Sequence, residues 1–191
     1  MKRNSLIISA VLISALSSTA NAKEWNVLPV MDEGYAPHFA VALIGGATQV
    51  DEKGSDQSDD DASTVGAELS LDCPLLKPPH HTIRQRVSYV QTNESGLKTK
   101  SLELNPHHMF EMGSKLQVGF GPSLGFTKLE TKTDDDTVFT YGVGASIRYN
   151  VTPSLFVGAE SRYAWAKDAE LDGNTVDFSN IRTMAKVGYQ F

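Results

Sequence analysis

The sequence predicts an all-β fold, an eight-stranded antiparallel up-and-down transmembrane β-barrel. Apolar and polar residues alternate through most of the chain, as they do in strands whose two faces meet different surroundings. The alternating segments run about 11 to 14 residues, against about 5–6 in soluble sheets, and a tilted strand crosses a bilayer in about 9–11. Long and short connections also alternate between most segments, as in barrels whose longer loops lie outside the cell.

Eight segments fit this pattern, and the clearest runs from Leu116 to Phe126, where apolar residues and Pro122 alternate with Gln, Gly and Ser. The predicted strands cover residues 38–50, 63–73, 81–92, 97–109, 115–127, 138–150, 154–167 and 178–191. Acidic loops are predicted at 51–62, 128–137 and 168–177, and shorter turns at 74–80, 93–96, 111–114 and 150–153. The barrel is therefore expected to occupy residues 37–191.

The N-terminus predicts export. Lys2 and Arg3 form a basic head, residues 5–15 are apolar, and Ala20-Asn21-Ala22 is a small-x-small cleavage site. The apolar run is shorter than the ~20 residues of a membrane anchor, so we expect a cleaved signal peptide over residues 1–22. Residues 23–36 show no alternation and are interpreted as a short periplasmic leader.

Composition excludes several classes of protein. With 40% hydrophobic residues, 21% charged residues and a mean hydropathy of -0.24, the chain is no polytopic helical membrane protein. A net charge of -6 argues against nucleic acid as a partner. The single cysteine, Cys73, excludes a disulfide framework.

One face of the alternating strands holds nearly all of their charges. The acids are Glu68, Asp72, Glu103 and Glu160, and the bases are Arg84, Arg86, Arg148, Arg162, Arg182 and Lys186. In a soluble sandwich, the alternative fold, this face would be solvated. An eight-stranded barrel is just wide enough to be filled by side chains, so the charges would pair inside it. We therefore predict a closed, salt-bridged lumen.

The third hairpin makes that prediction specific. A two-residue turn at Glu94-Ser95 would place Arg86 opposite Glu103, and Ser88 opposite Ser101. Aromatic residues fall near the strand ends and predict two interfacial girdles. The members expected at the two levels are Phe39, Phe110, Tyr149, Phe156, Tyr189 and Phe191, and Tyr89, Phe126, Phe139, Tyr141, Tyr163, Trp165 and Phe178.

The signal peptide, the eight amphipathic strands and the terminal Phe191 resemble the small outer-membrane barrels of the OmpA/OmpX/opacity-protein type. Residues 149–160 resemble the sixth strand, turn and seventh strand of that group. The resemblance implies that Tyr189 and Phe191 form the signal for the barrel-insertion machinery. It also implies an outer-membrane location, contact with outer-membrane lipid and lipopolysaccharide, and a monomer. It is strong for architecture and weak for activity.

Two histidine pairs are weak candidates for a metal site: His80, His81, His107 and His108. The same hairpin register places His81 opposite His108, but adjacent strand residues point to opposite faces, so at most two imidazoles share a side. No metal or cofactor is therefore predicted. The acidic runs 59–61 and 134–136 could bind divalent cations, although solvated charge is the favoured interpretation.

No catalytic residues are predicted. Glu103 and Glu160 could act as acid and base, but the interior network explains them better. The sequence favours a non-enzymatic outer-membrane barrel whose acidic extracellular loops serve envelope structure, or surface interaction and adhesion with a surface ligand. The alternatives are a barrel enzyme that modifies lipid A and a narrow channel for small solutes.

Overall fold

The computed structural model describes residues 25–50, 62–94, 97–131, 133–166, 169–171, 174–176 and 179–191. The predicted signal peptide, the acidic run 59–61 and Phe178 lie outside these residues. Within the described residues, no helix is long and apolar enough to cross a membrane.

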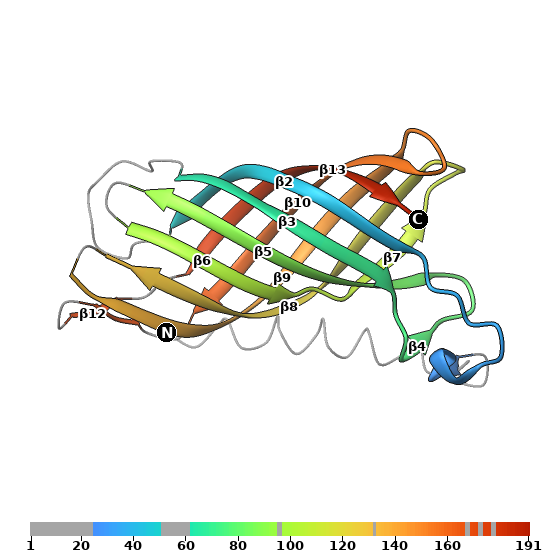
Figure 1. Ribbon diagram of the computed structural model, residues 1–191, viewed down its shortest axis with the longest axis horizontal. Coiled ribbons are helices and arrows are strands. Elements are labelled where there is room, and N and C mark those ends of the chain that lie inside the picture. The colour runs from blue at the N-terminus through green and yellow to red at the C-terminus, as the bar shows by residue number, and fades with distance from the viewer. Residues whose placement is uncertain are drawn as a thin grey trace, which may run out of the picture.

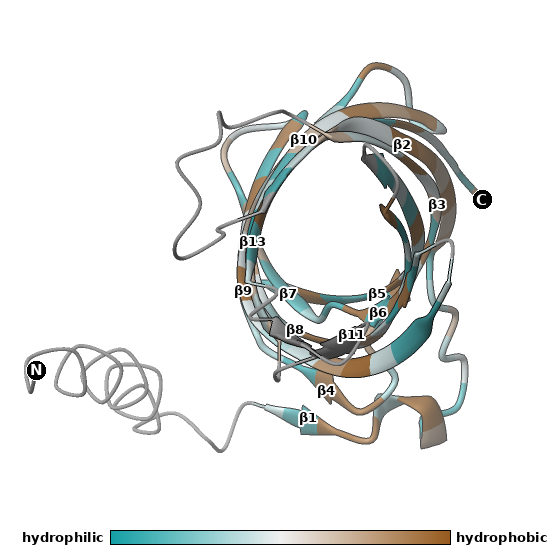
Figure 2. Ribbon diagram, turned by 90° about the vertical axis from the view of Figure 1, so that its left-hand side faces the viewer, coloured by the Kyte–Doolittle hydropathy of each residue, from teal (hydrophilic) through white to brown (hydrophobic). Residues whose placement is uncertain are grey.

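The described chain forms a closed, antiparallel eight-stranded barrel, which confirms the predicted fold class (Figures 1 and 2). In order around the wall the strands are β2 (Phe39–Val50), β3 (Ala62–Asp72), β5 (Thr82–Glu94), β6 (Leu97–Leu104) with β7 (His107–Glu111), β8 (Leu116–Glu130), β9 (Asp135–Asn150), β10 (Leu155–Ala166) and β13 (Asn180–Gln190). β6 and β7 share one place in the wall, because the strand predicted at 97–109 is interrupted at Asn105 and Pro106. β13 pairs with β2 and closes the barrel.

The wall is apolar outside and polar inside. On β9 the exposed fractions of Val143 and Ile147 are 54% and 43%, whereas those of Ser146 and Arg148 are 6% and 5%. The period of two in the sequence thus places every second side chain in the lumen. The buried residues of this barrel are mostly charged or hydroxyl-bearing, and most of the large apolar residues lie on its outer surface.

Two predicted loops contain further strand structure. β8 and β9 continue to Glu130 and Asp135, so most of the segment predicted as a loop at 128–137 is a paired hairpin. Leu129, which lies in this extension, packs against Val138, so the longer hairpin buries apolar surface. Within the segment predicted as a loop at 168–177, the short strands β11 (Ala169–Leu171) and β12 (Asn174–Val176) pair with each other.

The described part of the segment predicted as a leader, residues 25–36, also contains secondary structure. β1 (Asn26–Val27) pairs with β4 (Leu76–Lys77), which lies in the connection between β3 and β5, and the 3-10 turn η2 (Pro29–Met31) follows β1. A two-residue strand is too short to show alternation, so the sequence pattern could not reveal it.

Most of the predicted girdle residues in the described chain are at least partly exposed on the outer wall, including Phe39, Tyr141 and Tyr189. Phe156 was predicted there, and that prediction is wrong, because its side chain is 2% exposed and lies inside the barrel. Gly188 leaves room for it, since a Cβ on Gly188 would approach the Phe156 ring to 2.3 Å.

Candidate functional site in the barrel lumen

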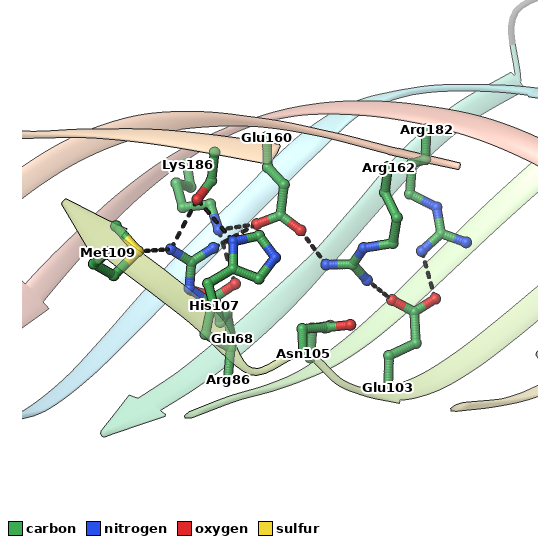
Figure 3. A network of polar contacts seen from close by, with 12 residues as sticks. Glu68, Arg86, Glu103, Asn105, His107, Met109, Glu160, Arg162, Arg182 and Lys186 are labelled. Carbon is green, nitrogen blue, oxygen red and sulfur yellow. Dashed lines mark hydrogen bonds and ion pairs between the residues drawn. The ribbon is translucent and has the colours of Figure 1, made fainter. Parts of the chain in front are cut away.

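The ten charged residues singled out in the sequence lie along the inward face of the wall. Nine of them are buried, namely Glu68, Arg84, Arg86, Glu103, Arg148, Glu160, Arg162, Arg182 and Lys186. The tenth, Asp72, lies at the periplasmic end of β3 and is partly exposed. The structure brings seven of these side chains into one connected network across the middle of the lumen (Figure 3).

Glu160 on β10 is the centre of that network. Its Oε2 accepts hydrogen bonds from Arg86 Nη1 and from Lys186 Nζ, each at 2.8 Å. Its Oε1 accepts a hydrogen bond from Arg162 Nη2. Lys186 also donates to Glu68 on β3 at 2.8 Å. Three cations from three strands therefore surround one buried carboxylate.

Glu103 on β6 holds the other end of the network. Its Oε1 accepts a hydrogen bond from Arg182 Nη1 at 2.8 Å, and its Oε2 accepts one from Arg162 Nη1. Arg162 thus connects the two carboxylates with its two terminal nitrogens, one to each, as the planar fork of a guanidinium allows.

The predicted pairing of Arg86 with Glu103 is wrong. In the third hairpin Glu94 pairs with Leu97, so Glu103 faces Ser88. Arg86 meets Asn105, whose backbone N–H donates to the Arg86 carbonyl at 2.7 Å. The true register differs from the predicted one by two residues. A shift of two keeps every side chain on its face, so Arg86 still points into the lumen, but its carboxylate partner becomes Glu160.

Three further lumen residues, which sequence reasoning did not include in the network, contact Arg86 or lie beside it, and two of them, Met109 and His107, are seen in Figure 3. Arg86 Nη2 donates to Ser146 Oγ at 3.0 Å and approaches Met109 Sδ at 3.2 Å. His107 Nδ1 is 3.0 Å from the same Ser146 hydroxyl. Each of these residues has the parity of an inward-facing position on its strand, and this was the signal that could have found them.

The four histidines do not form one site. His107 is fully buried in the lumen, whereas His81 and His108 pack on the outer side, with ring centroids 5.1 Å apart. The predicted pairing of His81 with His108 is wrong, because His108 faces Ile83. His80 is exposed on the connection between β3 and β5. Among the described residues, no group of three or more His, Cys, Asp or Glu side chains could hold a metal ion.

A vestibule of about 610 Å³ lies at the periplasmic end of the lumen. Asp72 links its rim to the interior, because its carboxylate lies 2.7 Å from His38 Nδ1 and 3.4 Å from Arg84 Nη1. The Tyr35 hydroxyl donates to the Asp72 carbonyl at 3.1 Å, and burial together with the Asp72 charge raises the pKa of this phenol. Residues of the leader therefore help to form the periplasmic mouth.

Arg148, near this end, has a different kind of partner. Its Nε donates to Asn150 Oδ1 at 3.0 Å, its Nη2 donates to Gln190 Oε1, and its guanidinium carbon lies 3.7 Å from the centre of the Phe156 ring. Amide oxygens and a ring face therefore support this cation. Phe156 lies inside the lumen beneath it.

The extracellular third of the lumen is lined by hydroxyl groups. Thr64 Oγ1 lies 2.6 Å from Thr48 Oγ1 and 2.8 Å from Thr92 Oγ1, and Ser101 Oγ lies 2.9 Å from Thr127 Oγ1. Further along β8 and β9, the apolar pair of Leu129 and Val138 packs with Leu97 and Ala166.

The remaining sequence candidates lie at the periplasmic edge. Tyr189 and Phe191 are exposed on the outside, with ring centroids 5.2 Å apart. Cys73 is buried, and Gln85 Nε2 donates to its sulfur at 3.4 Å.

Residues 8–191 match the family of outer membrane protein beta-barrel domains. Among solved structures, Neisserial surface protein A is similar at 17% identity and a TM-score of 0.57, over 80% of this chain and 97% of that one. Ail, the attachment invasion locus protein of Yersinia pestis, is 15% identical with a TM-score of 0.54, over 82% of this chain and 100% of that one. At such identities the likeness shows the fold alone. No curated protein matches the sequence.

Proposed function

This chain belongs to the family of outer membrane protein beta-barrel domains and resides in the outer membrane, and from that premise we propose that it is a closed, non-enzymatic barrel with a surface-contact role. Its acidic extracellular loops would serve envelope structure or surface interaction. Residues 1–22 would be removed on export, and residues 23–36 would form the leader. Lipopolysaccharide would surround the outer wall, and Tyr189 with Phe191 would signal to the insertion machinery.

One observation supports a closed lumen: the ion-pair network extends across the lumen from one side of the wall to the other. Arg86 on β5 meets Glu160 on β10, and Glu103 on β6 meets Arg182 on β13. Each of these two pairs joins strands four positions apart around the eight-stranded wall, which is the greatest possible separation. Moving a solute through would require breaking these pairs in a medium where unpaired charge is costly.

The same network argues against catalysis at the two central carboxylates. Glu160 is held by three cations and Glu103 by two, so each is committed as a hydrogen-bond acceptor. An acid–base pair needs a free approach to a substrate, and this interior is filled.

The charge of the loops supports surface contact with a cationic partner. Residues 51–62, 128–137 and 168–177 together contain 14 acidic and three basic residues. Asp134 and Asp135 are exposed at the tip of the β8–β9 hairpin. Ail has been solved in complex with sucrose octasulfate, a heparin analogue. The acidic loops of this chain favour the opposite charge in a ligand.

Planar-bilayer recording tests the closed lumen. The wild-type barrel should show no steady conductance, whereas a variant with Glu103→Ala and Arg162→Ala should leak, because it loses two of the side chains that bridge the walls. Glu130→Ala, on the outer face of the hairpin, is the matched control and should stay closed. Stable conductance steps in the wild type would instead support a channel.

Mass spectrometry of lipid A tests the non-enzymatic part of the proposal. Lipid A from cells with and without the protein should have the same acyl-chain pattern. A mass difference that requires the folded barrel would support an enzyme.

A further inference from the structure

Beside the periplasmic mouth of the barrel lies a small apolar unit, which we call the annex. It consists of β1, η2 and β4 with the adjoining residues Leu28 and Leu75. The annex exposes six large apolar side chains, with exposed fractions from 39% to 79%: Val27, Leu28, Val30, Met31, Leu75 and Leu76. This concentration of exposed apolar residues lies outside the strands that cross the membrane. A patch of this kind marks a contact with a membrane or another protein.

The annex is an ordered unit rather than a loose tail. Leu28 N donates to Leu75 O at 2.8 Å, and Val30 N donates to Pro74 O at 3.3 Å, in addition to the β1–β4 pairing. Pro29 is fully buried and lines the vestibule, so one side of the annex packs toward the barrel mouth. The apolar side chains that remain exposed are therefore held in place.

Backbone strain fixes the direction of the turn. Leu28 has φ 59° and ψ 52°, and it is the only non-glycine residue with positive φ in the described chain. A residue with a branched, bulky side chain adopts this region only at a cost, which the surrounding hydrogen bonds offset. With Leu28 in this conformation, Pro29 lines the vestibule while Val30 and Met31 stay exposed.

The position of the annex identifies its partner. Viewed along the barrel, β1, β4 and η2 lie outside the ring of strands, and in the side view they lie at its periplasmic end (Figures 1 and 2). The lipid-facing wall reaches this end at exposed residues such as Phe39 and Leu69 on the neighbouring strands β2 and β3. The apolar surface of the annex is thus at the rim of the wall that faces lipid.

We propose that the annex is a membrane foot that inserts its apolar side chains into the headgroup boundary of the periplasmic phospholipid leaflet. Short amphipathic segments that lie beside a membrane bind through buried apolar area in this way. A second copy of the chain is a poorer fit, because a stable protein interface uses about 20–30 residues a side and the patch has six. Asp32 and Glu33, which follow η2, suit the aqueous side of the boundary.

Tryptophan quenching by brominated phospholipids tests the foot. The chain has two tryptophans, so Trp25→Phe with Trp165→Phe gives a tryptophan-free background. Met31→Trp in that background places one probe on the foot. Val143→Trp, on the lipid-facing wall, is the positive control, and Thr133→Trp, at the exposed tip of the β8–β9 hairpin, is the negative control.

In phosphatidylethanolamine vesicles containing lipid brominated near the headgroup, the Met31→Trp probe should lose as much fluorescence as the Val143→Trp probe, while the Thr133→Trp probe loses none. Adding Val27→Ser and Val30→Ser should reduce this loss, with heat-modifiable gel migration showing that the barrel still folds. The proposal is overturned if the probe escapes bromine but stays open to iodide in the water, which means a solvated annex. It is equally overturned if neither quencher reaches the probe, which means a protein contact.

Discussion

The centre and the extracellular third of the lumen are filled by different interactions, although both are enclosed by the same strands. In the centre, long charged side chains meet across the lumen, as Arg86 on β5 meets Glu160 on β10. In the extracellular third, hydroxyl groups bond over short distances along the wall, as Thr64 on β3 meets Thr48 on β2 and Thr92 on β5. The centre therefore obstructs the lumen, whereas the extracellular third lines it.

The difference follows from the reach of the side chains. Threonine and serine are too short to meet across an eight-stranded barrel, so their hydroxyls find partners along the wall. Arginine, lysine and glutamate extend to the far side, where their charges must be paired because the surroundings are closed to water. The two regions should consequently respond very differently to the loss of one polar group.

The largest effect is expected at the central carboxylate. Glu160→Gln keeps the volume but leaves Arg86, Arg162 and Lys186 without their shared anion, so the barrel should lose about 3–5 kcal/mol of unfolding free energy. Urea titration of the barrel in phospholipid vesicles, scored by gel migration before and after boiling, measures this. A loss under about 1 kcal/mol would put the centre on a par with the hydroxyl region.

A smaller effect should distinguish the true partner of Arg86 from the predicted one. A double-mutant cycle of Arg86→Met with Glu160→Gln should give a coupling energy of about 0.5–3 kcal/mol, because the two groups are 2.8 Å apart. The cycle of Arg86→Met with Glu103→Gln should give a smaller value, since those residues make no direct ion pair. A larger coupling energy for Arg86 with Glu103 than for Arg86 with Glu160 would instead support the pairing predicted from the sequence.

The hydroxyl region should be less sensitive still. Thr64→Val removes a group that lies 2.6 Å from Thr48 Oγ1 and 2.8 Å from Thr92 Oγ1, and it should cost about 1 kcal/mol. The triple variant with valine at all three positions should cost less than the single change, because no hydroxyl is left without a partner. Equilibrium unfolding in urea checks both, and a triple variant as unstable as Glu160→Gln would remove the contrast between the regions.

The smallest effect is expected where ion pairs lie in water. On the outer face of the β8–β9 hairpin, Glu130 pairs with Lys100 at 2.8 Å and with Lys128 at 3.2 Å. Glu130→Gln should change stability less than Thr64→Val does, because solvent screens these charges. The change should shrink further in high salt, and thermal unfolding at two salt concentrations tests this.

Alternation, together with the length of the strands and the aromatic residues near their ends, predicted the barrel and the inward direction of its charges. It could not predict which strand residues meet, because one turn residue more or less changes every pair in a hairpin. In the third hairpin Glu94 was predicted in the turn but pairs with Leu97, so the register differs by two residues and Glu103 faces Ser88 instead of Arg86. Contacts across the lumen could not be predicted from the sequence either, because they depend on the shear of the whole barrel rather than on any one turn.

Phe156 shows where residue type misled the prediction. It has the same parity as Glu160 and Arg162 on β10, so alternation already placed it inside. Its aromatic character suggested the girdle instead. The space that accepts its ring comes from Gly188 on the next strand, and this contact is visible only once the β10–β13 register is known.

The seam between β2 and β13 has a consequence for the order of events in the cell. Ala40 pairs with Gln190, so the barrel is closed by two strands from opposite ends of the chain, about 150 residues apart. Closure therefore cannot take place until β13 has been synthesised and exported. Until then β2 and β13 each present an open edge that could pair with another chain. The passage across the periplasm is thus the period in which these open strand edges are most exposed to pairing with other chains.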